Sequence, residues 1–281
     1  MIQNRTDWLR LANIAALVIT LFMNGISNSD WFPQTVGDLG ESYGIFFLPA
    51  GYVFGIWGVI YSGLLAYVIF QAREEKKADS VARRIGGWFI ISCVGNVAWL
   101  LLFLYSQLWL STVAMLVILG SLLVIYTRLN IGLNKDATWG ERLAVHVPFS
   151  IYLGWISVAT VANFSTALFD SGSITAFAGI DSATWAAIMM GVAAVLAFGM
   201  LALRRDLAYA LVIVWATVGI NARPFDTDLY SAVASLDASL VNSVAIGVAA
   251  IVGVAVLARA ASLLIGNRTD NMTPVSSGAP A

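Results

Sequence analysis

Charge is scarce in this chain of 281 residues: Asp, Glu, Lys and Arg together make up 11% of it, against about 25% in an ordinary soluble domain. Cysteine and histidine occur once each, as Cys93 and His146. A single cysteine excludes an intramolecular disulfide framework and a multi-cysteine metal site. The net charge of −1 gives no electrostatic footprint for nucleic acid, so we expect no nucleic-acid partner.

The groups that ordinary catalysis needs are also missing. The sequence contains no recognisable nucleophile–base–acid set, metal-ligand cluster or phosphate-binding loop. We therefore expect a binding or transport protein rather than an enzyme. Chemistry on a bound ligand that uses an indole side chain stays an open alternative.

Apolar sequence takes the place of charge. Hydrophobic residues make up 59% of the chain and the mean hydropathy is +0.83, which predicts an all-α polytopic membrane protein. Eight apolar runs are long enough, or nearly so, to cross a hydrocarbon core of about 30 Å. They are 9–27, 46–70, 88–105, 112–127, 145–169, 184–203, 207–222 and 240–265.

The polar links between these runs place the basic residues on one side. If the eight runs alternate in direction, all 15 Lys and Arg residues except Arg223 fall on the side of the two termini. The positive-inside rule then predicts that both termini are cytoplasmic. We expect an integral protein of a bacterial inner membrane, with an organelle membrane as the alternative, and a disordered tail over 266–281.

The run 145–169 carries a patterned face rather than uniform apolar sequence. Trp155, Ala159 and Asn163 recur every four residues, so they share one side of a helix. An unpaired amide in hydrocarbon costs several kcal/mol. This face must therefore meet other helices or a ligand.

The run 88–105 carries a similar face, formed by Asn96, Trp99 and Phe103. A hydrogen bond between helices is the simpler interpretation of Asn96 alone. Two such faces in one bundle make a shared polar and aromatic pocket the alternative interpretation.

The second apolar run combines small and aromatic residues. Gly51 and Gly55 form a small-xxx-small pair that is typical of close helix packing, and Tyr52, Phe54 and Trp57 gather around it. Packing alone does not account for the aromatic cluster, so we expect some of these rings to face a ligand.

Four fragments lie in order along the second, third and fifth runs. They are Pro49-Ala50-Gly51-Tyr52-Val53-Phe54, Asn96-x-x-Trp99-x-x-x-Phe103, Val147-Pro148-Phe149 and Trp155-x-x-x-Ala159-Thr160-x-x-Asn163. In this order and spacing they resemble helices of the translocator protein family, also called the tryptophan-rich sensory proteins (TspO/MBR). The resemblance covers about 9–170, and the chain adds about three further apolar runs.

The resemblance implies a TspO-like five-helix bundle over 1–170, followed by about three additional transmembrane helices over 171–265. It also implies a pocket near the link between the first two helices, where family members bind tetrapyrroles such as haem and protoporphyrin, and some bind sterols. By matched position the ligand-binding candidates are Tyr52, Phe54, Trp57, Asn96, Trp99, Phe103, Trp155, Ala159 and Asn163.

These residue types suit a flat apolar ligand with a polar edge. Indole and phenol rings offer stacking area, and the amides of Asn96 and Asn163 can pair with carboxylates or ring N–H groups. His146 lies near the end of its run and gives no obvious axial ligand for haem. We expect membrane lipid and a small apolar ligand, tetrapyrrole or sterol-like, as partners. A bound porphyrin or haem is the one cofactor candidate, and a homodimer is an open alternative.

Three functions stay open at this point. The leading hypothesis is a membrane-embedded protein that binds a tetrapyrrole or similar ligand in sensing, transport or disposal. The alternatives are a secondary transporter of a small molecule and a structural or assembly subunit of a larger membrane complex. We expect residues 184–265 to pack outside the five-helix unit, with neither Met190 nor Trp215 inserted between the second and fifth runs.

Overall fold

The computed structural model describes residues 5–37, 45–73, 76–170, 179–225 and 235–270, and every element within these ranges is helical. The elements are α1 (Arg5–Ile26), η1 (Gly51–Gly55), α3 (Ile56–Gln71), α4 (Lys76–Ile85), α5 (Trp88–Leu104), α6 (Leu108–Leu129), α7 (Trp139–Glu141), η2 (Arg142–His146), α8 (Val147–Asp170), α9 (Ser182–Gly199), η3 (Met200–Arg204), α10 (Leu207–Asn221) and α11 (Ser235–Asp270).

The prediction of an all-α polytopic membrane protein is confirmed. Among the described residues, 6 helices are long and apolar enough to cross a membrane, and α4 with α5 adds a span bent by 56°. The remaining apolar helix, α10, has 15 residues and is about 22 Å long, shorter than a hydrocarbon core. Each of the eight predicted runs therefore coincides with an apolar helix, although α5 and α10 are short ones.

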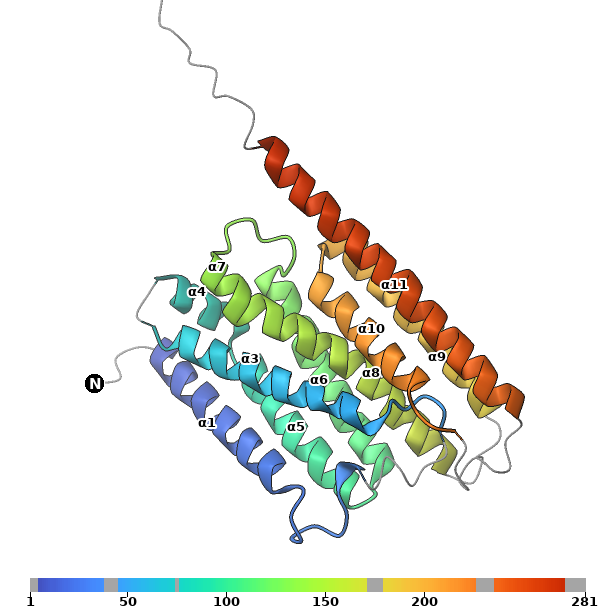
Figure 1. Cartoon of the computed structure of the whole chain (residues 1–281). Helices are drawn as coiled ribbons and strands as arrows, with labels where there is room; N and C mark the ends of the chain where they lie inside the picture. The colour runs from blue at the N-terminus through green and yellow to red at the C-terminus, as the bar shows by residue number, and fades with distance from the viewer. Residues whose placement is uncertain (1–4, 38–44, 74–75, 171–178, 226–234, 271–281) are drawn as a thin grey trace, which may run out of the picture.

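Five of these helices close into a ring. α1 packs against α5, α5 against α6, α6 against α8, α8 against α3, and α3 back against α1. The other three form a second group, in which α10 packs on α8 and η1, while α11 packs on α10 and α9 (Figure 1). Because α8 belongs to the ring and also supports α10, it is the most enclosed span, with 67% of its most apolar window buried against 17% for α1.

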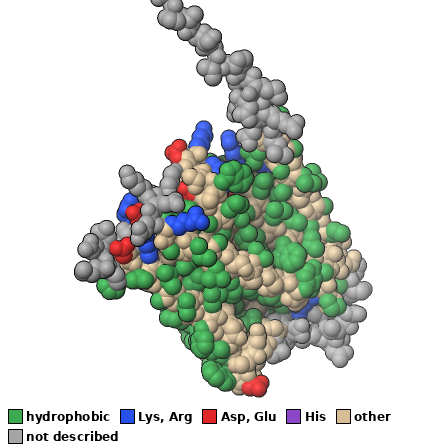
Figure 2. All heavy atoms as spheres, turned by 60° about the vertical axis from the view of Figure 1, so that its left-hand side comes forward, with side chains coloured by type: hydrophobic (Ala, Val, Ile, Leu, Met, Phe, Trp, Pro, Cys, Tyr) green, Lys and Arg blue, Asp and Glu red, His purple; other side chains and the backbone are tan. Residues whose placement is uncertain are grey.

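The basic residues of the described chain gather at one end of the bundle, which Figure 2 shows at its upper side. Side chains join the links there. Arg10 pairs with Asp79, Arg84 Nε donates to the carbonyl of Arg128 at 2.8 Å, and Arg204 Nη1 donates to Asn130 Oδ1 at 3.1 Å. These contacts bring three links and the first helix together at one end, as the alternating topology requires.

The charged link between the second and third runs holds a helix that the hydropathy pattern does not reveal. α4 has basic and acidic residues on one side, while Ala78, Val81, Ala82 and Ile85 are buried on the other. Their spacing of three and four residues is the signal of a short amphipathic helix. The link is therefore folded onto the bundle rather than extended.

The second span begins later than predicted. Residues 46–50 are not helical, and the chain enters the span through the 3₁₀ turn η1. Pro49 explains the shift, since proline lacks a backbone N–H and disfavours helical geometry in the residue before it. Ile45, Phe46, Phe47 and Leu48 are nonetheless buried, so this non-helical segment lies inside the protein.

Helix α11 extends through Asp270, beyond the predicted end of the eighth run at 265. It rises past its neighbours at its carboxyl end (Figure 1). The rest of the predicted disordered tail, 271–281, lies outside the described residues.

Helix α10 is fastened to η1 through backbone groups. The N–H of Ala50 donates to the carbonyl of Gly219 at 3.0 Å, and the indole N–H of Trp215 donates to the carbonyl of Val53 at 3.1 Å. A Cβ on Gly219 would overlap Cγ2 of the fully buried Val53. Only glycine at this position allows the two segments to come so close.

We expect Gly219→Ala to destabilise the protein, because a methyl group at this contact overpacks a stiff β-branched neighbour at a cost of about 1–3 kcal/mol. The measurement is the thermal unfolding midpoint in detergent. Gly191→Ala on α9 is the matched control, since nothing lies within 4 Å of its new Cβ. Equal midpoints for the two variants would contradict a close contact between α10 and η1.

Candidate functional site

A cavity of about 280 Å³ lies at the end of the bundle opposite to the basic end, where α1, η1, α3 and α5 meet. Its walls come from the end of α1, the link that follows α1, and the non-helical entry to the second span. The first turns of α3 and the last turns of α5 complete them. Its lining residues are Asn24, Ser27, Asn28, Val36, Gly37, Leu48, Pro49, Gly51, Phe54, Trp57, Tyr61, Trp99, Leu100 and Arg223.

A second, smaller cavity of about 50 Å³ adjoins the first on the side of α8. The two share the wall residues Val36, Leu48, Pro49, Phe54 and Trp99. The remaining lining of the smaller cavity is Phe103, Met115, Trp155, Val158, Ala159, Ala162, Asn163 and Thr166. The rings of Phe54 and Trp99 therefore face both spaces.

Four aromatic rings form a continuous stack beside these cavities. Tyr61 stacks on Trp57 with centroids 5.4 Å apart, Trp57 on Trp99 at 5.9 Å, and Trp99 on Phe103 at 5.7 Å. The planes of each successive pair differ by only 24–27°. The stack joins α3 to α5 and makes a wall of nearly parallel rings.

The ring of Trp155 meets this stack edge-on, and Phe54 in turn meets Trp155. Trp155 on α8 is perpendicular to Trp57, at 6.3 Å and 85°, and to Phe54, at 5.7 Å and 89°. Edge-to-face geometry places ring hydrogens against π-faces, which is a favourable arrangement worth about 0.5–1.5 kcal/mol for each pair. The rings thus hold one another in place without filling the cavities.

The amide of Asn163 anchors the stack. Its Oδ1 accepts from Trp99 Nε1 at 3.0 Å, and its Nδ2 donates to Thr112 Oγ1 at 2.7 Å and Ser111 Oγ at 2.9 Å. These partners belong to α5 and α6, so one side chain of α8 joins three helices. Since its hydrogen-bonding groups are already used, Asn163 acts first as a structural residue that orients Trp99.

The amide of Asn96 lies behind the wall rather than in it. Asn96 is fully buried, and its Oδ1 accepts from Asn24 Nδ2 at 2.8 Å. Neither its Nδ2 nor the hydroxyl of Tyr61 has a hydrogen-bond partner among the described residues, although both atoms are buried. Tyr61 lines the larger cavity with its ring, whereas its hydroxyl oxygen is shielded from that space and lies beside the amide of Asn96.

The structure brings most of the predicted site residues together. Those that line one or both cavities are Phe54, Trp57, Trp99, Phe103, Trp155, Ala159 and Asn163. Asn96 lines neither. Tyr52 faces away, with 54% of its surface exposed and its ring edge-on to Trp215 at 5.6 Å in a separate outer groove between α3, α8 and α10.

The polar part of the lining of the larger cavity, called its mouth below, was not predicted. It consists of Asn24, Ser27, Asn28 and Arg223. Asn24, Ser27 and Asn28 line it from the end of α1, and their spacing of three and four residues already indicates one polar helix face. Arg223 lines it from the segment after α10. In the sequence, Arg223 was distinguished as the one Lys or Arg residue predicted to lie on the side of the membrane opposite to the termini.

The expectation that residues 184–265 stay outside the pocket holds for the helices but is wrong for Arg223. Neither Met190 nor Trp215 lines either cavity. Trp215 instead lines the outer groove, where it reaches the backbone of η1.

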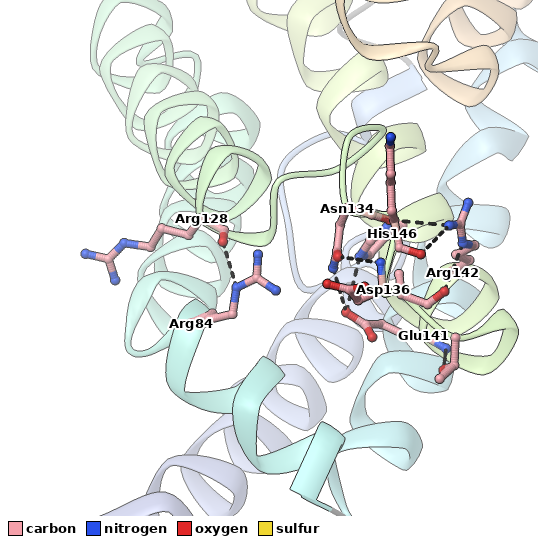
Figure 3. A network of polar contacts seen from close by, with 10 residues as sticks. Arg84, Arg128, Asn134, Asp136, Glu141, Arg142 and His146 are labelled. Carbon is pink, nitrogen blue, oxygen red and sulfur yellow. Dashed lines mark hydrogen bonds and ion pairs between the residues drawn. The ribbon is translucent and has the colours of Figure 1, made fainter. Parts of the chain in front are cut away.

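A second polar cluster lies at the opposite, basic end of α8 (Figure 3). His146 Nε2 faces Glu141 Oε1 at 3.4 Å, both side chains are buried, and Asn134 Nδ2 donates to the same oxygen at 3.5 Å. The described residues contain no group of three His, Cys, Asp or Glu that could hold a metal. We interpret the cluster as a structural support for the π-helical turn η2.

A comparison with protein families assigns the fold. The model of the family described as TSPO-like protein matches residues 10–258. The chain belongs to this family. No curated protein and no solved structure matches it. The match runs through α9 and α10 and ends within α11. It therefore includes two of the further helices of this TSPO-like protein and part of the third, beyond the range 9–170 that first suggested the resemblance.

We expect Asn163 and Trp99 to be energetically coupled. Asn163→Leu leaves the indole N–H of Trp99 without an acceptor, while Trp99→Phe removes that N–H but keeps a stacking ring. Hydrogen bonds between membrane helices average about 0.6 kcal/mol and reach about 1.7 kcal/mol. The double-mutant cycle on the free energy of unfolding in detergent should therefore give a coupling of about 1 kcal/mol. Additive effects of the two substitutions would contradict it.

Proposed function

We propose that this TSPO-like protein is a membrane-embedded binding protein for a flat, largely apolar ligand of the tetrapyrrole class, acting in its sensing, transport or disposal. The observation that carries the proposal is the stack of Tyr61, Trp57, Trp99 and Phe103 beside a cavity at one end of the bundle. Rings stacked in this way support one another, and the side of the stack offers a rigid apolar surface against which a macrocycle can pack.

The chemistry of the cavity supports a ligand with both apolar and polar parts. The aromatic wall supplies apolar contact area, while polar and charged side chains line another part of the same cavity. Polar sites in ligand pockets are few and fix the orientation of what binds. The mouth favours a polar ligand edge.

The size of the cavity sets a condition on the proposal. Ligand sites have volumes of about 300–1,000 Å³, and the larger cavity has about 280 Å³. A tetrapyrrole macrocycle needs more room, so it must also occupy the adjoining space of about 50 Å³ and displace the ring between them. Phe54 is the ring to move, because it is only partly buried and has no polar group to hold it.

Substitution of the central ring tests the proposal. We expect the full-length protein in detergent to bind protoporphyrin or haem, and Trp57→Leu to weaken this binding by about two- to thirteenfold, the equivalent of one lost aromatic contact. The measurement is the change in ligand absorbance and fluorescence on titration. Trp109→Leu is the matched control, since Trp109 is 52% exposed on α6 and lines neither cavity.

Two outcomes oppose the proposal. If the parent protein binds protoporphyrin and haem no more tightly than a flat hydrocarbon such as pyrene, the tetrapyrrole class is excluded. If it binds them but Trp57→Leu and Trp109→Leu behave alike, the ligand occupies another part of the molecule.

We also propose that both termini face the cytoplasm of a bacterial cell, because the links at the terminal side carry every Lys and Arg except Arg223. Reporter domains inserted within 171–178 and fused after 281 should then report opposite sides of the membrane. Signals from the same side would contradict both the orientation and the alternation of eight spans.

A further inference from the structure

Arg223 stands out among the charged residues because it is half-buried in the lining of the larger cavity. Within the described part of the chain, its guanidinium makes no hydrogen bond and no ion pair. The other described Arg and Lys residues lie toward the opposite end, in α1, in the links there and in the second half of α11. A cation that borders an aromatic cavity without a partner points to an anion that binds there.

The simpler interpretation is that Arg223 complements the dipole of α10. It follows the last turn, its N–H donates to the carbonyl of Ile220 at 3.2 Å, and a cation near a helix carboxyl end contributes about 0.3–1 kcal/mol. The dipole does not require the side chain to line a cavity, however. Any residue of the last turn, on any face, serves equally well.

The position of Arg223 is set by contacts that hold the end of α10 against the cavity wall. The hydrogen bonds from Ala50 to Gly219 and from Trp215 to Val53 attach the end of α10 to η1, which itself lines the cavity through Gly51 and Phe54. Gly219 lies only four residues before Arg223. The mouth is therefore built jointly by the five-helix ring and by the helices outside it.

The donors and acceptors around the mouth are unequally used. Asn24 Nδ2 already donates to the carbonyl of Thr20 at 2.9 Å and to Asn96 Oδ1 at 2.8 Å, and the hydroxyl of Ser27 donates to the carbonyl of Asn24 at 2.7 Å. Arg223 has five N–H groups in a planar fork, which matches the two oxygens of a carboxylate. Of these side chains it is the one with the most donors still open.

We propose that Arg223 binds a carboxylate of the ligand at the mouth of this cavity. The proposal rests on the proposed function and narrows it: the ligand is an amphiphilic anion, with its ring system against Trp57 and Trp99 and its charged edge toward Arg223. Helix α10 thereby contributes a specificity-determining residue to a cavity otherwise formed by the ring of five helices.

The experiment compares a charged ligand with its neutral ester. Protoporphyrin and its dimethyl ester are titrated into the full-length protein in detergent micelles free of phospholipid, so that a lipid phosphate cannot take the place of the carboxylate. Arg223→Gln should weaken binding of protoporphyrin about tenfold and change binding of the ester by less than about twofold. Arg223→Lys should retain most of the affinity, and 1 M salt should reduce the difference between parent and Arg223→Gln.

Arg73→Gln is the matched control, because Arg73 is an exposed arginine beyond the far end of α3. The part of α3 from Tyr61, which lines the cavity, to Gln71 is about 15 Å long, so Arg73 lies beyond that distance along the helix axis. It should leave the binding of both ligands unchanged.

The outcomes separate the two proposals. If the parent binds neither the acid nor the ester, the proposed function itself fails. If the parent binds both and Arg223→Gln weakens both equally, Arg223 supports the fold and the carboxylate assignment is overturned. If Arg223→Gln changes neither, the carboxylate binds elsewhere, while the tetrapyrrole proposal still stands.

Discussion

The rest of the site depends on the hydrogen bonds that the side-chain amide of Asn163 makes. Inside a bilayer no water satisfies a polar side chain, so each donor and acceptor must find a partner in the protein. Asn163 meets this requirement because its amide oxygen accepts a hydrogen bond from Trp99, and its amide nitrogen donates to Ser111 and Thr112. Because the indole of Trp99 has a single N–H, this bond fixes the plane of its ring. The planes of Trp57 and Phe103 follow from it by stacking.

A second constraint acts where Pro49 interrupts the second span. Non-helical backbone at this depth exposes peptide groups that must be paired, and α10 supplies the partners for Ala50 and Val53. The same helix end then delivers Arg223 to the cavity. The interruption of the second span at Pro49 and the packing of α10 against it therefore depend on the same hydrogen bonds. This is why α10, a helix outside the ring of five, takes part in forming the mouth.

The two ends of α8 differ in kind. At the basic end, Glu141 and His146 are paired within a folded turn, and neighbouring arginines bind backbone carbonyls. At the other end, aromatic rings surround open space, and the guanidinium of Arg223 has no hydrogen-bond or ion-pair partner among the described residues. The difference lies in the open space, since buried polar atoms without a hydrogen-bond partner occur at both ends, among them His146 Nε2 at the basic end. The cavity and the position of Arg223 agree on the same end of the molecule.

The sequence by itself determined the elements that depend on local composition. Long apolar runs specify membrane helices, and the four-residue repeat of Trp155, Ala159 and Asn163 put them on one face whatever the fold. It could not tell whether the Asn163 amide serves a ligand or its neighbours, because its partners Ser111 and Thr112 are some 50 residues away in the chain. Nor could it assign Tyr52, one residue from Val53 in the turn η1, to the outer groove. Only the tertiary structure decided these points, and it alone brought Arg223 to the cavity. Each depends on which helices pack together, and hydropathy carries no information about that choice.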